Sequence, residues 1–206
     1  MELSARQNDA LTELINIGFA RAAASLSELT GHRVLLEAPQ VAICAISDLS
    51  KILGDHIQEE TVTVHQLFSG PVSGDALLLL DYNGAIILKE LLTDEPAIAN
   101  RLDASGREVL TEVGNILLNA CLGMFGNLLR VHVTFSVPRL HLETLKSVLH
   151  SLVIEQEGLR YALVVFTTFR LRDGAVSGYL VMMLGVSSLD RFIQEIERWD
   201  EHQSQG

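Results

Sequence analysis

Apolar residues recur at intervals of three and four along the first thirty positions, which is the spacing of one helix face. The residues on this stripe are Leu11, Leu14, Ile15, Gly18 and Ala22. The spacing predicts a helix over residues 4–30, and Gly31 is of the residue type that commonly ends helices.

Alternating and continuous apolar runs follow this helix, and both patterns are typical of strands. The predicted elements are a strand over 33–46 broken near Pro39, a short helix over 47–54, a β-hairpin over 61–82 and a helix over 83–94. Ser47 or Asp48 is suited to cap the short helix, and the hairpin turn falls at residues 69–74. The first half of the chain is therefore predicted to mix helices and strands.

The second half predicts the same kinds of elements in the same order. They are a helix over 105–129, a strand over 130–140, a short helix over 141–150, a hairpin over 161–184 and a last helix from about 187 to 198. A polar tail, expected to fray, follows the last helix. Residues 95–106 have the composition of a linker between the two halves.

Matching residues recur at a fixed distance in the two halves. Glu13, Asn16, Val34 and Pro39 reappear 99 residues later as Glu112, Asn115, Val133 and Pro138. The tripeptide at 72–74 reappears 104 residues later at 176–178, so five residues are inserted between the two blocks. We infer a duplicated α+β unit, with repeat one at about 4–98 and repeat two at about 105–200, within a single domain of residues 1–206.

Composition and charge narrow the class of protein. The chain has 206 residues, a hydrophobic content of 48% and a mean hydropathy of +0.28, which is enough apolar material for a large core. Its formal net charge of −11 argues against binding nucleic acids or anionic membranes. We see no signal peptide or membrane-length apolar run, and we expect a cytoplasmic protein. Cys44 and Cys121 are predicted to be buried thiols.

The two long helices carry matching polar faces opposite their apolar stripes. On the first helix the polar residues are Asp9, Glu13 and Asn16, and on the second they are Glu108, Glu112, Asn115 and Asn119. The position that matches Asn119 on the first helix is Ala20. Because these residues lie away from the apolar stripes, we expect the Glu and Asn side chains to face solvent.

A single Glu-x-x-Asn pair is ordinarily just a solvated helix face. Two pairs at the same phase argue against that interpretation, and Asn is a poor helix former that an ordinary surface would not select. No Ser, Cys or His lies at the right phase to form a nucleophile system. A carboxylate and an amide one turn apart can grip a cation and orient a water molecule. This chemistry fits hydrolysis of a bond that a partner protein presents.

Each half resembles the pattern Asp/Ser-x3-Glu-x2-Asn-x22-Pro of the CheC, CheX and FliY phosphatases of chemotaxis. Asp9, Glu13, Asn16 and Pro39 match all four positions of the pattern. The second half matches with Glu112, Asn115 and Pro138, but its first position is Glu108. The resemblance covers nearly the whole chain, and the presence of two motifs is similar to CheC.

The resemblance implies a CheC-like α+β fold, in which two tandem repeats with internal pseudo-two-fold symmetry form an antiparallel sheet flanked by helices. It implies a protein aspartyl-phosphate phosphatase that acts on phosphorylated CheY. Asn16 and Asn115 would position the attacking water, and Glu13 and Glu112 would pair with a lysine of the regulator. Mg²⁺ is expected on the response regulator, and no cofactor is expected on this chain. Asp9, Glu108 and Asn119 are expected to help bind the regulator.

Two other functions stay open. The chain could be a non-catalytic binding adaptor for CheD or for a response regulator, and CheD is a possible partner in either case. A flagellar-switch component is less expected, because 206 residues leave no room for the additional segments of FliY. The seven histidines show no metal-ligand spacing, so no metal site is expected.

Overall fold

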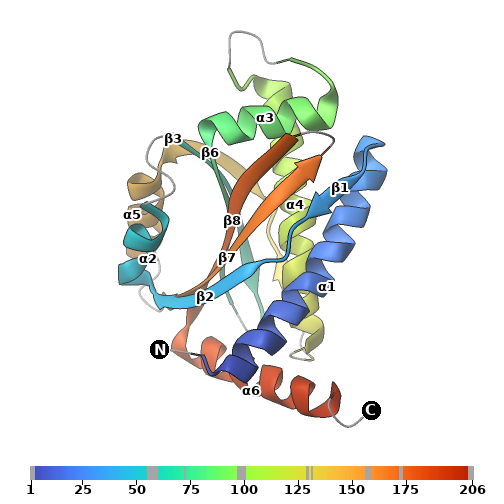
Figure 1. Cartoon of the computed structure of the whole chain (residues 1–206). Coiled ribbons are helices and arrows are strands. Elements are labelled where there is room, and N and C mark those ends of the chain that lie inside the picture. The colour runs from blue at the N-terminus through green and yellow to red at the C-terminus, as the bar shows by residue number, and fades with distance from the viewer. Residues whose placement is uncertain are drawn as a thin grey trace.

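The structure is a computed structural model that describes residues 3–54, 60–71, 73–96, 101–128, 130, 132–155, 159–171 and 174–203. Six helices occur among these residues (Figure 1). Their bounds are α1 Ala5–Thr30, α2 Ile46–Gly54, α3 Tyr82–Thr93, α4 Ala104–Leu128, α5 Leu145–Glu155 and α6 Val186–Gln203. The two long helices, α1 and α4, confirm the helices predicted from the apolar spacing.

Local hydrogen bonds fix where α1 begins and ends. The Ser4 side chain accepts a hydrogen bond from the Gln7 backbone N–H, and the Gln7 side chain accepts one from the Ser4 backbone in return. This capping box satisfies two backbone donors at the start of the helix. Gly31, with a φ of 69°, ends α1 in the left-handed conformation that glycine adopts most easily.

The strands form one antiparallel sheet. Their bounds are β1 Val34–Leu36, β2 Gln40–Ala45, β3 Glu60–Ser69, β4 Gly74–Asp81, β5 Thr134–Phe135, β6 Arg139–Thr144, β7 Leu159–Leu171 and β8 Gly174–Gly185. The order across the sheet is β1-β7-β8-β4-β3-β5, with β2 also paired to β7 and β6 also paired to β3. The first strands of each half therefore pair with the hairpin of the other half.

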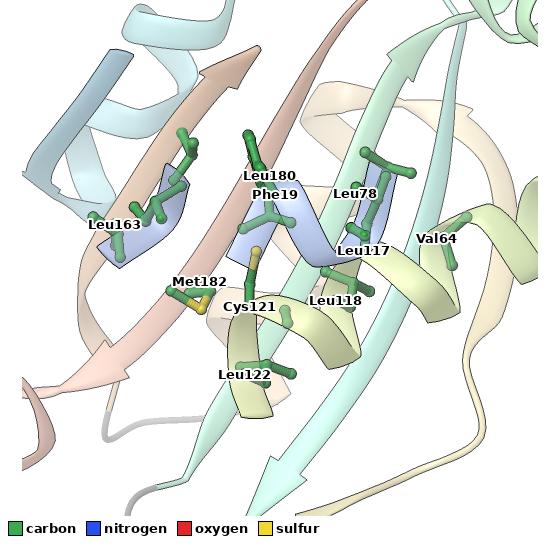
Figure 2. Close-up of a cluster of buried hydrophobic side chains, with 14 of the residues drawn as sticks. Phe19, Val64, Leu78, Leu117, Leu118, Cys121, Leu122, Leu163, Leu180 and Met182 are labelled. Carbon is green, nitrogen blue, oxygen red and sulfur yellow. The ribbon is translucent and has the colours of Figure 1, made fainter. Parts of the chain in front are cut away.

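Helices cover both faces of this sheet (Figure 1). On one face α1 and α4 pack over the larger core, which includes Phe19, Val64, Leu78 and Cys121 (Figure 2). On the other face α2 and α5 cover a smaller core. The central strand β4 is buried from Gly74 to Leu80, which explains why its sequence is continuously apolar rather than alternating.

The two cysteines differ in burial. Cys121 is completely buried, and burial raises the pKa of its thiol to about 12. Cys44 is half-buried, which corrects the prediction that both thiols are buried. Burial, and then the charge of Asp48, raise the pKa of Cys44 as well. Both thiols are free.

The order of the elements repeats, as the sequence predicts. Each half runs α-β-β-α-β-β-α, and α1 and α4 begin 99 residues apart. At the centre of the sheet Leu77 pairs with Val181, which lies 104 residues later. Five residues separate the paired Phe68 and Gly74, whereas ten separate Thr167 and Gly178. The inserted five residues therefore lengthen the β7–β8 hairpin. The symmetry operation itself stays an inference from these correspondences.

The bounds of α1, α3 and α4 lie within one residue of those predicted, and the other three helices differ in ways that change their interpretation. The helix expected at 141–150 lies at Leu145–Glu155, because residues 139–144 pair with β3 as strand β6. Thr144 accepts a hydrogen bond from the Ser147 backbone N–H at 3.3 Å and so caps α5.

The other two differences are smaller. α2 begins at Ile46, so Ser47 and Asp48 lie inside its first turn and neither is the N-cap. α6 continues to Gln203, beyond the predicted end at 198, and its Trp199 packs against the larger core. Part of the predicted linker, residues 97–100, lies outside the described residues. No helix in the described part of the chain has the length and apolar character that a membrane span needs.

Candidate functional site

The two motif helices lie side by side and run in opposite directions on one face of the sheet (Figure 1). A Cβ atom built on Gly18 of α1 would lie 3.6 Å from the backbone oxygen of Ala120 and 3.7 Å from Cys121 on α4. The apolar stripes predicted on the two helices are buried. They comprise Leu11, Leu14, Ile15, Gly18 and Ala22 on α1, and Leu110, Val113, Gly114, Leu117 and Cys121 on α4.

Gly114 sets how closely α4 approaches the sheet. A Cβ atom at this position would lie 2.5 Å from Cγ1 of Val64 on β3, which is closer than side chains tolerate. The residue that follows is Asn115, one of the two predicted water-positioning residues. The close contact therefore fixes the height of Asn115 above the sheet.

The acidic motif residues lie on the outer surface. Glu13 and Glu112 are exposed, as are Asp9 and Glu108. Within the described residues, neither Glu13 nor Glu112 has a hydrogen bond or an ion pair. Their carboxylates are therefore free to accept donors from another molecule.

The two asparagines lie deeper than expected. Asn16 and Asn115 are both half-buried, so they face solvent only in part, whereas the prediction had them facing solvent like the glutamates. Each lies one turn beyond its exposed Glu, at the border between the buried stripe and the outer face. Neighbouring residues restrict the conformations of a half-buried amide side chain, and this favours a fixed orientation.

A chain of side-chain amides holds Asn115. Nδ2 of Asn119 donates to Oδ1 of Asn115 at 2.7 Å. Nε2 of Gln66, a buried residue of β3, donates to Oδ1 of Asn119 at 3.2 Å and to the Ser136 backbone oxygen at 2.9 Å. These hydrogen bonds connect the motif helix α4 to the sheet, and the amide oxygen of Asn115 accepts one of them. Its Nδ2 stays available to a partner.

The matching site on α1 is more open. Ala20 stands where α4 carries Asn119, so it cannot provide the equivalent hydrogen bond. A hollow of about 430 Å³ lies beside Asn16. It is lined by Asn16, Phe19, Ala20, Ala23, Ala24 and Ser27 of α1 and by residues 33–36. The two motif sites therefore share their Glu and Asn but differ in what surrounds the Asn.

Gln66, Ser136 and Arg33 contribute to these surroundings and were not predicted from the sequence. Gln66 was a usable signal, because it lies between Val64 and Phe68 on the apolar face of β3 and buried polar side chains need a partner. Arg33 and Ser136 carry no such signal, since their positions depend on how strands from the two halves pair.

The arrangement can bind donors and orient a water molecule. The exposed carboxylates can accept hydrogen bonds from a cationic side chain, and the amides offer both a donor and an acceptor. Among the described residues no three His, Cys, Asp or Glu side chains converge as a metal site requires.

No protein-family model matches the chain. Solved structures match nearly all of it. FliY of Thermotoga maritima is 17% identical with a TM-score of 0.76, over 96% of this chain and 99% of that one. The FliM middle domain of H. pylori is 10% identical with a TM-score of 0.65, over 94% of this chain and 99% of that one.

A CheC-like superfamily protein from Shewanella is 8% identical with a TM-score of 0.51, over 83% of this chain and 96% of that one. The likeness extends across both halves and includes the helices that carry the motifs. It confirms the α+β fold with an antiparallel sheet that the sequence resemblance implied. The chain therefore has the CheC-like fold, which it shares with FliY and the FliM middle domain.

Proposed function

We propose that this protein is an aspartyl-phosphate phosphatase that acts on a phosphorylated CheY-type response regulator. The observation that carries the proposal is the presentation of two Glu-x-x-Asn pairs on adjacent helices. In both pairs the Glu is exposed and the Asn is half-buried. The CheC-like fold and the sequence resemblance to the CheC, CheX and FliY phosphatases support the proposal.

Hydrolysis requires a water molecule to attack the phosphorus atom while the bond from phosphorus to the aspartate oxygen breaks. The amide of Asn16 or Asn115 accepts a hydrogen bond from this water and donates one to a phosphoryl oxygen. Aspartate leaves as a carboxylate, and inorganic phosphate is released. A glutamine positions the water of GTP hydrolysis in a similar way.

Glu13 and Glu112 hold the regulator in register by pairing with its lysine. A carboxylate without a partner in the free protein forms such a pair without first breaking another one. The Mg²⁺ expected from the resemblance belongs to the regulator, where it would neutralise charge on the phosphoryl oxygens. Asp9 and Glu108 extend the contact surface around the two pairs, and Asn119 holds the amide of Asn115.

A second candidate function is binding without catalysis. The likeness to FliM of H. pylori favours it, because that protein has been solved in a complex with FliG. In this case the acidic faces of α1 and α4 dock a regulator, CheD or a flagellar protein, and phosphate release is unchanged. Unlike the phosphatase, this function gives no reason for an Asn one turn after each exposed Glu.

The test is a phosphate-release assay with a CheY-type regulator phosphorylated by a small phosphodonor. We expect the full chain, at substoichiometric concentration, to accelerate loss of the phosphoryl group with repeated turnover. Binding of the phosphorylated regulator without faster release would overturn the phosphatase and support the adaptor. The Glu28→Gln variant, altered at an exposed carboxylate elsewhere on α1, is the control for general changes in charge.

A further inference from the structure

A second polar cluster lies on the opposite face of the sheet, beside α5. It lines a hollow of about 690 Å³ between β3, β6 and α5. The polar residues of the lining are Thr63, His65, Ser136, Arg139, His141, Glu143 and Ser151, and the apolar ones are Leu67, Val137 and Val148. The volume is typical of sites that bind small molecules.

The corresponding positions in the other half are apolar. Along β2, Ala42 and Cys44 stand where β6 carries His141 and Glu143. On the hairpin, pairing across the sheet centre places Val164 and Tyr179 where the second cluster has His65 and Asp75. Cys44, Val164 and Tyr179 pack with Leu49 and Leu53 of α2 in the smaller core, whereas Ala42 is exposed.

The difference matters because the two halves share their order of elements. The same sheet face is filled with packed side chains under α2 and is polar and hollow beside α5. Polar residues in a position that packing would fill with apolar ones cost stability, so a structural role alone does not favour them.

The hollow contains several hydrogen-bond donors beside the carboxylates of Asp75 and Glu143. Nε2 of His65 lies 2.6 Å from Oδ1 of Asp75, whose side chain is 1% exposed. This buried carboxylate fixes the orientation of the imidazole. Only Nε2 contacts Asp75, so Nδ1 of His65 remains for another partner. The ring of His141 lies 6.2 Å from that of His65, measured between centroids.

Arg139 and Thr63 carry hydrogen-bond donors that a ligand can use. Within the described residues, Arg139 has no hydrogen bond and no ion pair. Thr63 is completely buried, and its hydroxyl has no hydrogen-bond partner among those residues. Glu143, the carboxylate of the lining, already accepts a hydrogen bond from Ser147 at 2.7 Å. An unpaired guanidinium with a buried, unpaired hydroxyl is the donor set that an oxyanion satisfies.

We propose that this hollow binds a small organic anion through a carboxylate or phosphate group. Arg139 and the two imidazoles hold the charged group, with the Thr63 hydroxyl donating from the floor. Leu67, Val137 and Val148 contact the apolar part of the molecule. The site is separate from the α1 and α4 motifs, and it stands whether or not the proposed phosphatase activity is confirmed.

The experiment titrates the full chain at pH 7 with inorganic phosphate and, separately, with acetate, while NMR follows the imidazole resonances of His65 and His141. Sodium chloride at matched ionic strength is the control for screening. We expect a saturable shift of both imidazoles with at least one oxyanion and none with chloride. A response to phosphate, to acetate or to both identifies the charged group.

Two variants test the donors. Arg139→Gln is expected to weaken binding about ten-fold, because it removes a charged donor. Arg191→Gln, at an exposed arginine of α6, is its matched control and should bind as wild type does. Thr63→Val should weaken binding without lowering the melting temperature, since the native hydroxyl has no protein partner to lose.

The proposal is overturned if neither oxyanion shifts the imidazoles beyond chloride. It is also overturned if Arg139→Gln binds as tightly as wild type, or if Arg191→Gln weakens binding equally. If Thr63→Val lowers the melting temperature but binds as tightly as wild type, the hydroxyl contributes to the stability of the fold and is not part of the site.

Discussion

At the scale of single residues, Asn16 and Asn115 have the same position on their helices but different neighbours. The oxygen of Asn115 accepts a hydrogen bond from Asn119, which is itself held by Gln66 of the sheet. Asn16 lies beside a hollow, with Ala20 in place of Asn119. We therefore expect both sites to work, with the orientation of the amide better fixed in the second.

This difference predicts a site-specific effect of Asn119→Ala. In an Asn16→Ala background, where only the second site can act, Asn119→Ala should lower kcat several-fold and leave regulator binding nearly unchanged. One neutral hydrogen bond contributes about 1 kcal/mol, which corresponds to roughly five-fold. The measurement is steady-state phosphate release at increasing regulator concentration.

The same substitution in an Asn115→Ala background is the control, because only the first site acts there and kcat should not change. If Asn119→Ala instead weakens regulator binding in the first background, Asn119 contacts the regulator directly. If it has no effect there, the amide chain does not position Asn115.

Glu13 and Glu112 are predicted to grip a lysine of the regulator. The double variant Glu13→Gln/Glu112→Gln keeps the shape of both side chains and removes their charge. Each charge-assisted contact contributes about 1–3 kcal/mol when the complex excludes water. Affinity for the activated regulator should fall, and its dependence on salt should become weaker.

Binding measured at two ionic strengths checks this prediction, with Glu28→Gln as the control on the same surface of α1. Equal affinity and equal salt response in the double variant and in wild type would show that the two carboxylates do not hold the regulator.

At the scale of elements, the contact of α4 with β3 positions the second site. Gly114→Ala places a methyl group 2.5 Å from Cγ1 of Val64. Overpacking of this kind costs about 1–3 kcal/mol, partly offset by the roughly 1 kcal/mol that alanine contributes to helix propensity. The free energy of unfolding in urea should therefore fall.

Gly123 provides the matched control in the same helix, because a Cβ atom there meets no atom within 4 Å. Gly123→Ala should be as stable as wild type or more stable, by up to about 1 kcal/mol. A Gly114→Ala variant at least as stable as Gly123→Ala would show that the close contact does not constrain α4.

The elements themselves were largely predictable from local patterns. The apolar spacing of α1 and α4 is long and regular, so their bounds differ from prediction by about one residue. The error at 141–150 arose where β6, with the sequence Arg-Leu-His-Leu-Glu-Thr, passes directly into α5. There the pairing of Leu140 and Leu142 with β3 decides the structure, and sequence spacing cannot reveal that pairing.

At the scale of the whole molecule, the two halves exchange strands across one sheet. β1 and β2 pair with β7 of the second half, while β5 and β6 pair with β3 of the first. The duplication was visible in the sequence, but this exchange was not, because pairing between distant strands has no local signature. Ser136 meets Gln66 only because the exchange brings it beside β3.

Because of the exchange, both motif helices pack on one continuous sheet. The two Glu-x-x-Asn pairs that they carry therefore lie in one layer of helices. The central claim is that the two asparagines catalyse loss of the phosphoryl group. Asn83, an exposed asparagine on α3, provides a control for the removal of a surface amide.

The most direct test compares the decay of a phosphorylated CheY-type regulator in the presence of wild type, Asn16→Ala/Asn115→Ala and Asn83→Ala. Circular dichroism establishes first that all three are folded. We predict that wild type and Asn83→Ala accelerate the decay equally, and that the double variant leaves it at the rate of the regulator alone. Acceleration by the double variant equal to that of wild type would contradict the account.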